Sequence, residues 1–336
     1  MESKLNFIEV CAGGGGLSSG LVKAGFTPIL LNDNNKDCCQ TLLKNHPETK
    51  VFCGSMTDID YTPYVDKVDL LTGGVPCQSF SQAGKRKGLE DVRGDLMIQF
   101  INIVNKVKPR IFMIENVKGL LTHKSGKAGE AGEGKTIDII LQKLNESNLY
   151  NIVFKCLDSS LYSVPQKRER VFIIGVLKTL GKSFSFPDPL QTKKVLEDVL
   201  VDVPPSIGAK YPEKKIDLFK KIPQGGCWIN LPEDEQKEYL GNSYFSGGGK
   251  RGILHRLSMK KPCLTLLCSP SQKQTERCHP LEERPLTVRE YARIQTFSDD
   301  YEFVGSMASQ YKQIGNAVPV QLAYEVGKEL RKVLEY

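Results

Sequence analysis

Alternation of short apolar runs with helix-like segments over the first 180 residues is the feature that most limits how this chain can fold. We expect strands at residues 5–10, 28–31, 68–71, 110–114, 152–157 and 171–176. Between several of them, apolar side chains recur every three or four positions, which predicts helices at residues 17–24, 36–44, 95–107 and 137–144. Strands that alternate with helices form βαβ units. The pattern therefore predicts an α/β fold with a mostly parallel, doubly wound sheet covered by helices on both faces.

This regular alternation ends near Leu177, after which prolines and glycines are scattered irregularly. We expect residues 181–283 to form a smaller, loop-rich domain with little helical periodicity. Helical spacing returns at residues 287–297 and again at residues 320–334.

Composition narrows the class of protein further. The 336 residues include 46 Lys and Arg against 39 Asp and Glu, a net charge of +7 that leans mildly towards a polyanionic partner. No uncharged apolar run approaches the roughly 20 residues of a membrane span, and no apolar signal segment opens the sequence. We therefore expect a cytoplasmic protein without a membrane partner, whose ten cysteines are free thiols. Four histidines make a multi-histidine metal site a poor hypothesis.

A glycine-rich stretch at residues 7–16 (FIEVCAGGGG) follows the first expected strand and precedes a helix. Such a turn brings backbone N–H groups close to a ligand. The dinucleotide fingerprint is not met, because its third glycine is replaced by Ser18. Asp33, twenty residues after Gly13, could accept two ribose hydroxyls. The pattern favours a nucleoside-containing cofactor rather than NAD in particular; the alternative is a tight turn without a ligand.

Two further motifs end strands at the edge where ligands of open α/β sheets bind. Cys77 follows Pro76 after the strand at 68–71, and a thiolate there could act as a nucleophile; the alternative is a small buried side chain. Glu115 and Asn116 end the apolar strand at 110–114. A desolvated carboxyl group there could share a proton, and the alternative is a capping role.

A basic motif at residues 165–170 (PQKRER) precedes the last strand of the first region. Arg168 and Arg170 are two apart, so on one strand both would point to the same face. Converging guanidinium groups suit a phosphate, a base carbonyl or a carboxylate, and the alternative is a solvated run of charges.

Two other patterns carry less weight. Residues 129–136 (GEAGEGKT) match the phosphate-loop pattern, but polar, flexible residues precede them where that motif requires a strand. Cys263, Cys268, Cys278 and His279 lack the spacing of a zinc site, so we expect no metal.

Taken in order, these motifs resemble those of the DNA (cytosine-5)-methyltransferase family, over nearly the whole chain. They are F-x-x-x-x-A-G-x-G-G at 7–16, P-C-Q at 76–78, E-N-V at 115–117, Q-x-R-x-R at 166–170, R-E-x-A-R at 289–293 and G-N-x-V at 315–318. The resemblance implies a Rossmann-like catalytic domain formed by residues 1–180 and 284–336, which binds S-adenosylmethionine. It also implies a target-recognition domain at residues 181–283.

The resemblance assigns roles to particular residues. As cofactor-binding residues it implies Cys11, Ala12, Gly13, Gly14, Gly16, Asp33, Asn34, Ser55, Met56, Pro76, Leu96, Asn316 and Ala317. As DNA-binding residues we expect Gln78, Ser81, Lys85, Arg86, Arg93, Gln166, Lys250, Arg251, Arg256 and Thr265. Residues 78–93 resemble a mobile lid, and residues 246–261 carry five basic residues and no acidic one.

The implied chemistry is addition of Cys77 to C6 of a flipped-out cytosine, with Glu115 at N3 and the amino group. Arg168 and Arg170 would hold the base carbonyl and a phosphate. S-adenosylmethionine would give up its methyl group and leave as S-adenosylhomocysteine.

Cys11, Asn34 and Ser55 depart from the family pattern around the adenine, which questions the adenine contacts but not the reaction. The expected enzyme is a bacterial or viral monomer of the compact restriction–modification type. It would act on double-stranded DNA, with a cognate endonuclease in the same system and no direct contact implied. The alternatives are a tRNA-directed member of the same family and a non-catalytic DNA-binding homologue.

Overall fold

Two compact units make up the chain in the computed structural model, which describes residues 4–76, 96–122, 124–125, 134–245 and 252–335. Unit 1 contains residues 1–158, 169–189 and 322–336, and unit 2 contains residues 159–168 and 190–321. Each unit has its own hydrophobic core. Within the described ranges no helix is long and apolar enough to cross a bilayer.

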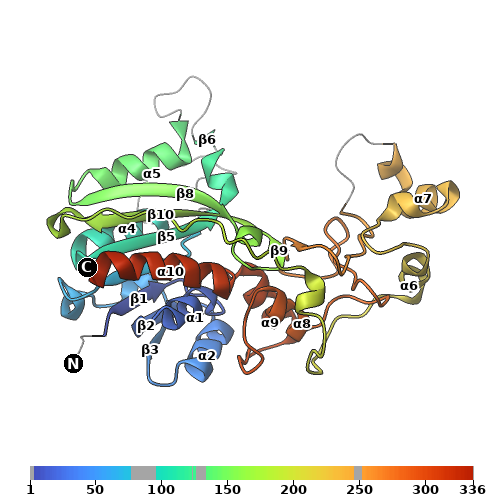
Figure 1. Ribbon diagram of the computed structural model, residues 1–336, viewed down its shortest axis with the longest axis horizontal. Helices are drawn as coiled ribbons and strands as arrows, with labels where there is room; N and C mark the ends of the chain where they lie inside the picture. The colour runs from blue at the N-terminus through green and yellow to red at the C-terminus, as the bar shows by residue number, and fades with distance from the viewer. Residues whose placement is uncertain (1–3, 77–95, 123, 126–133, 246–251, 336) are drawn as a thin grey trace. The chain divides into compact units, whose positions relative to one another are not determined.

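Unit 1 is built on a seven-stranded sheet with the order β3-β2-β1-β4-β5-β10-β8 (Figure 1). Its strands are β1 (Asn6–Val10), β2 (Thr27–Asp33), β3 (Lys50–Cys53), β4 (Leu70–Gly73), β5 (Ile111–Val117), β8 (Tyr150–Asp158) and β10 (Glu169–Leu177). The pairs among β3, β2, β1, β4 and β5 are parallel, whereas β10 is antiparallel to β5 and to β8. The prediction of a mostly parallel sheet is confirmed.

Helices cover both faces of this sheet, which confirms the doubly wound prediction. They are α1 (Gly16–Lys23), α2 (Lys36–Asn45), α4 (Leu96–Val107), α5 (Thr136–Asn145) and α10 (Val320–Glu335). Ile8 and Val10 of β1 share a buried core with the apolar faces of α4 and α5. On the other face α1 and α10 pack closely (Figure 1), since a Cβ atom added to Gly327 would lie 2.8 Å from that of Ala24.

The strand order reverses between β1 and β4, because β1 continues through α1 to β2 on one side while β4 and β5 lie on the other. Chain connections diverge at such a point, so a crevice opens beyond the carboxyl ends of the two strands. Here β1 runs into the glycine-rich loop, and β4 runs into Gly74, Val75 and Pro76.

Unit 2 contains four helices and a short parallel strand pair among its described residues. They are α6 (Glu213–Lys220), α7 (Glu233–Leu240), α8 (Val288–Ile294), α9 (Met307–Asn316), β9 (Gln166–Lys167) and β11 (Cys263–Leu264). One core joins α8 and α9, and a second surrounds Phe219 of α6. In the structure, α8 and α9 therefore belong to the same compact unit as residues 190–283. The division by function, into a catalytic domain at 1–180 and 284–336 and a target-recognition domain at 181–283, stays a prediction.

Candidate active site

The glycine-rich loop between β1 and α1 is a tight left-handed turn. Cys11, Gly13 and Gly15 all have positive φ, of 52°, 56° and 79°. Gly15 is the N-cap residue of α1, and its own side chain, a hydrogen atom, supplies no cap for the N–H groups at this helix end. Space above Gly13 is open, since an added Cβ atom would meet nothing within 4 Å.

Asp33, at the end of β2, holds this loop in place. One carboxylate oxygen, Oδ2, accepts the N–H of Gly13 at 2.9 Å, and the other, Oδ1, accepts the N–H of Asn35 at 2.8 Å. Each carboxylate oxygen can accept a second hydrogen bond. Asp33 therefore fixes the loop and keeps acceptor capacity, and its contact with ribose hydroxyl groups stays a prediction.

The other predicted cofactor residues of unit 1 come from several separate segments of the chain. Ser55 caps the 3₁₀ turn Met56–Asp58 by accepting from the N–H of Thr57, and Met56 is buried in the core of the unit. Asn34 and Pro76 are exposed, and Leu96 begins α4. The placement of these residues is compatible with a bound nucleoside, and their contacts with it stay predictions.

Substituting alanine for Gly13 should weaken cofactor binding without unfolding the protein. The positive φ costs a side-chain-bearing residue about 1 kcal/mol, and the new methyl group would enter the open space above the loop. For S-adenosylmethionine, the cofactor that the family resemblance implies, we expect at least a tenfold weaker affinity by titration calorimetry. Gly181 is the matched control, because it has a φ of 63°, an equally open Cβ position and a place outside the loop. Equal affinities in the two variants would refute a ligand above Gly13.

A buried carboxyl group, which the sequence analysis did not single out, lies at the base of the loop. Glu9 of β1 is 1% exposed, is hydrogen-bonded to Ser18 of α1, and has one oxygen, Oε2, without a hydrogen-bond partner. Burial raises the pKa of Glu9 from its ordinary 4.5 to about 8, and the nearby charges of Asp33 and Glu115 raise it further while Ser18 lowers it. The signal available in the sequence was an acidic residue in the middle of a buried apolar strand.

The ends of β4 and β5 bring the E-N-V motif against the segment that leads to Cys77. Asn116 donates its Nδ2 hydrogen to the carbonyl oxygen of Val75 at 2.8 Å. A Cβ atom on Gly74 would lie 3.3 Å from Oε2 of Glu115. Asn116 is therefore a positioning residue for the chain two residues before the predicted nucleophile. Cys77 itself lies outside the described residues, as do Gln78, Ser81, Lys85, Arg86 and Arg93.

Glu115 and Arg170 form a buried ion pair across β5 and β10. Nε of Arg170 lies 2.9 Å from Oε1 of Glu115, with side chains 12% and 10% exposed. Burial lowers the pKa of Arg170, while the charge of Glu115 and its hydrogen bond act in the opposite direction. The pair holds a carboxylate and a guanidinium together at the carboxyl end of β5, a pairing that the sequence analysis did not predict.

Arg168 occupies a different setting, and the predicted convergence of two guanidinium groups is wrong. Its side chain is 1% exposed in unit 2 and donates to the carbonyl oxygens of Leu266, Gly315 and Asn316 at 3.1, 2.8 and 3.1 Å. The premise of one continuous strand fails, because β9 ends at Lys167 and β10 begins at Glu169. We revise the role of Arg168 from ligand contact to positioning residue.

Two residues predicted to contact DNA are likewise engaged inside unit 2. Gln166 is fully buried between Gln295 and the N–H of Leu266, at 2.8 and 2.9 Å. Arg256 is buried against Glu283 and the carbonyl oxygen of Phe219, at 2.7 and 2.8 Å. Since their polar groups are occupied by the protein, we revise both to structural roles.

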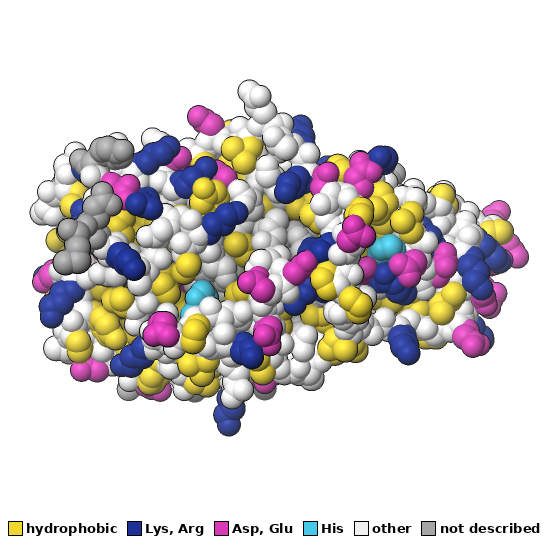
Figure 2. All heavy atoms as spheres, turned by 60° about the horizontal axis from the view of Figure 1, so that its bottom comes forward, with side chains coloured by type: hydrophobic (Ala, Val, Ile, Leu, Met, Phe, Trp, Pro, Cys, Tyr) yellow, Lys and Arg dark blue, Asp and Glu magenta, His cyan; other side chains and the backbone are white. Residues whose placement is uncertain are grey.

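Of the remaining predicted DNA contacts, the structure describes Thr265 alone. Thr265 is partly exposed, and its hydroxyl donates to the carbonyl oxygen of Lys167 at 2.7 Å. Lys250 and Arg251 lie outside the described residues. On the face drawn in Figure 2, basic and acidic side chains are interspersed, so the net charge of +7 is not concentrated there.

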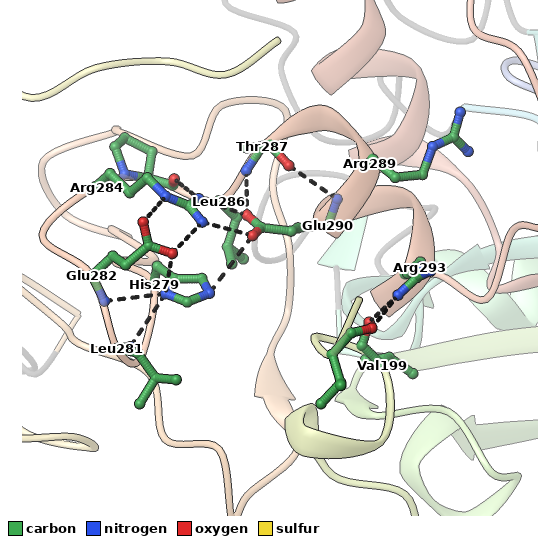
Figure 3. Close-up of polar contacts among 12 residues, drawn as sticks. Val199, His279, Leu281, Glu282, Arg284, Leu286, Thr287, Arg289, Glu290 and Arg293 are labelled. Atoms are coloured by element: carbon green, nitrogen blue, oxygen red, sulfur yellow. Dashed lines mark hydrogen bonds and ion pairs between the residues drawn. The ribbon is translucent and has the colours of Figure 1, made fainter. Parts of the chain in front are cut away.

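The R-E-x-A-R helix, α8, is the centre of a polar network within unit 2 (Figure 3). The two carboxylate oxygens of Glu290 accept hydrogen bonds from the two terminal nitrogens of Arg284, each at 2.8 Å. Thr287 and Glu290 form a capping box. Arg293 donates to the carbonyl oxygens of Val199, Val201 and Asp202. Burial alone would raise the pKa of Glu290, but its hydrogen bonds with Arg284 and Thr287 bring it below its ordinary value. The sequence T-x-x-E at Thr287–Glu290 could have predicted the capping box. Nothing in the sequence indicated that Arg284 would pair with Glu290.

His279 joins the same network from the segment before α8. Its Nδ1 accepts the N–H groups of Leu281 and Glu282 at 3.2 Å, and its Nε2 lies 3.6 Å from Glu290 (Figure 3). Burial lowers the pKa of His279, which favours the neutral ring that these contacts require. Nδ1 of His279 is thus engaged as an acceptor in the protein rather than presented as a metal ligand. Among the described residues no group of three or more His, Cys, Asp or Glu side chains is arranged to hold a metal ion.

Comparison with known proteins identifies what this chain is similar to. The family described as C-5 cytosine-specific DNA methylase matches residues 5–332. The Type II methyltransferase M.Eco47II of Escherichia coli is 47% identical over 98% of this chain and 79% of its own length. M.PspPI of a Psychrobacter species is 46% identical over the same shares. A prophage-encoded E. coli structure, provisionally described as a DNA modification methyltransferase, superposes with a TM-score of 0.72 at 25% identity, covering 99% of this chain and all of its own.

Proposed function

Because this chain belongs to the family of C-5 cytosine-specific DNA methylases, we propose that it is a Type II, sequence-specific DNA cytosine-5 methyltransferase that uses S-adenosylmethionine. The relatives named Type II methyltransferases support the class of enzyme. The single structural observation that carries the proposal is the buried Glu115–Arg170 pair beside the segment that leads into Cys77.

The residues at the switch point fit S-adenosylmethionine. The space above Gly13 is open, Asp33 can accept ribose hydroxyls, and a buried carboxyl oxygen of Glu9 lacks a partner. The predicted cofactor residues of unit 1 would hold the nucleoside, and Asn316 and Ala317 at the end of α9 stay predicted contributors. Bound there, the cofactor supplies the methyl group and leaves as S-adenosylhomocysteine.

The chain's own residues activate the base. The Cys77 thiolate forms a bond from Sγ to C6 of cytosine, while Glu115 hydrogen-bonds N3 and the amino group and supplies a proton to the ring. This makes C5 electron-rich enough to take the methyl group. Loss of the C5 proton to solvent then expels Sγ from C6, and return of the N3 proton to Glu115 restores the neutral aromatic ring. Arg170 holds Glu115 in position and can donate to the base carbonyl.

Access to these groups requires the cytosine to leave the duplex, which costs a few kcal/mol. Residues 78–93 and 246–251 would supply the predicted basic contacts, through Lys85, Arg86, Arg93, Lys250 and Arg251. Neutralising phosphates in this way makes the affinity for DNA fall with salt. Residues 181–283 remain the proposed target-recognition domain.

A duplex containing 5-fluorocytosine should trap the protein covalently. Fluorine at C5 cannot leave as a proton does, so the adduct persists when S-adenosylmethionine is present. The duplex must contain the DNA sequence that the protein recognises. Bisulfite sequencing of plasmid DNA from cells that express the protein identifies that sequence beforehand. The expected result is a denaturation-resistant complex with the wild-type protein and none with Cys77→Ser.

The control for this experiment is Cys53→Ser, an exposed cysteine of β3 that should leave trapping intact. A plasmid without methylated cytosine, together with no adduct, would refute the proposal in favour of a non-catalytic homologue. If the protein methylates tRNA and not duplex DNA, its substrate is tRNA.

A further inference from the structure

Two cysteine thiols meet where helix α2 packs against strand β3 (Figure 1). Cys39 lies on α2 and is 3% exposed, whereas Cys53 is the last residue of β3 and is exposed. A hydrogen bond joins the two thiols, so a small movement brings the sulfur atoms within bonding distance. Burial raises the pKa of Cys39, and the hydrogen bond to Cys53 raises it further. A reagent in solvent therefore reaches Cys53 first, and Cys39 is the protonated thiol beside it.

The same two residues are attached to Asp33, which holds the glycine-rich loop. Sγ of Cys39 donates to the carbonyl oxygen of Asp33 at 3.2 Å. The N–H of Gly54 donates to the same oxygen at 3.0 Å. In the parallel ladder of β2 and β3, Cys53 is the partner of Asp33. A covalent bond between the two sulfur atoms would therefore remove one donor from this carbonyl group and act directly on the residue whose carboxylate accepts the N–H of Gly13.

We propose that Cys39 and Cys53 form a redox-sensitive pair, whose disulfide weakens binding of the cofactor at the glycine-rich loop. The effect on binding rests on the proposed function, since it takes S-adenosylmethionine as the ligand, whereas formation of the disulfide does not. The free thiols expected from the sequence are the reduced state of this pair. Disulfides that form in a reducing compartment are usually transient and act in catalysis or redox sensing.

A peroxide is the class of oxidant that this pair requires. Sγ of Cys53 attacks one oxygen of hydrogen peroxide and breaks the O–O bond, which gives a sulfenic acid and, with the proton of the thiol, water. Sγ of Cys39 then bonds to Sγ of Cys53 and displaces the hydroxyl group, which leaves as water with the proton of Cys39. The two thiols lose two electrons in all, and one peroxide becomes two waters. A dithiol reductant reverses the reaction by thiol–disulfide exchange.

The direction of the effect follows from the movement that the disulfide requires. Bonded sulfur atoms are about 2 Å apart, closer than two hydrogen-bonded thiols, so α2 and β3 must approach each other. Asn35, the N-cap residue of α2, donates its N–H to the carboxylate of Asp33 at 2.8 Å, so a shift of α2 is transmitted to that carboxylate. We expect the affinity for the cofactor to fall by at least about fivefold, the lower end of typical couplings between sites.

The test is oxidation of the full chain with hydrogen peroxide, followed by two measurements. Mass spectrometry of alkylated peptides detects the disulfide without any cofactor, and titration calorimetry measures the affinity for S-adenosylmethionine. Affinity replaces methyl transfer as the readout because peroxide also attacks Cys77, the proposed nucleophile. The expected result is a disulfide between Cys39 and Cys53, an affinity at least about fivefold weaker than that of the reduced protein, and recovery of the affinity with dithiothreitol.

Serine variants separate this pair from the other thiols. Cys53→Ser changes an exposed side chain, and after oxidation it should form no disulfide with Cys39 and keep its affinity. Cys38→Ser is the matched control, because Cys38 is the partly exposed neighbour of Cys39 on α2 and its replacement keeps both members of the pair. This variant should form the disulfide and lose affinity as wild type does. A loss of affinity that persists in Cys53→Ser overturns the proposal, because another thiol then causes it.

Failure of the inference and failure of the proposed function look different in this experiment. Oxidised wild type without the disulfide, or with the disulfide and an unchanged affinity, overturns the role of the pair and leaves the function standing. No binding of S-adenosylmethionine to the reduced wild-type protein overturns the proposed function and the effect on affinity together, whether or not the disulfide forms.

Discussion

Exchanging Glu115 for glutamine should lower the rate of methyl transfer by about 10²- to 10⁴-fold, the range typical for loss of a positioned acid or base. The amide keeps nearly the same shape and can still accept from Arg170, but it cannot supply a proton to N3 of cytosine. The loss should therefore appear in kcat, with cofactor affinity and DNA affinity close to those of the wild type. Single-turnover transfer of labelled methyl groups measures it directly.

A neighbouring ion pair provides the matched control for this variant. Glu169 of β10 pairs with Lys118 at 2.7 Å, but the two side chains are 46% and 56% exposed. Glu169→Gln should keep full activity and change stability by less than about 1 kcal/mol, because solvent screens exposed pairs. If Glu115→Gln folds and turns over within a few-fold of wild type, the proton comes from another group and the assignment of Glu115 fails.

Hydrophobic spacing predicted most of the sheet and its helices because each of these elements buries one regular face. Strand β3 was missed, since only four residues form it and none of them is fully buried. Helix α9 was missed for a related reason, because glutamine, serine and glycine interrupt its apolar spacing. The antiparallel direction of β10 could not be read either, because an apolar strand has the same pattern in both directions.

For the candidate site, the sequence predicted which residues lie at the same edge of the sheet but not which side chains pair with one another. Strand ends correctly placed Glu115, Asn116 and the glycine-rich loop at one edge, because parallel strands share that edge. Pairing partners came only with the structure, as the ion pair of Arg170 and the internal bonds of Gln166 and Arg256 show. Glu9 was overlooked because its strand was read as an apolar run, although a charge inside such a run indicates a special environment.

Replacing Arg168 by methionine should destabilise unit 2 by about 3–5 kcal/mol, the usual cost of removing one partner from a buried charged contact. The guanidinium joins the carbonyl oxygens of Leu266, Gly315 and Asn316, and a methionine of similar length leaves all three without this donor. We expect a lower denaturation midpoint and faster amide exchange at residues 313–317. Lysine at this position should recover part of the loss, because its single ammonium reaches fewer carbonyls.

Lys167→Met is the control, since Lys167 is the exposed neighbour of Arg168 and should cost less than about 0.5 kcal/mol. The outcome distinguishes the two roles that have been considered for Arg168. Lost activity together with the predicted loss of stability is what a positioning residue produces. The other outcome is lost activity in a variant that is as stable as wild type, with unchanged amide exchange at the end of α9. It would restore the original prediction that Arg168 contacts the substrate, because the carbonyl oxygens would then not depend on the guanidinium group.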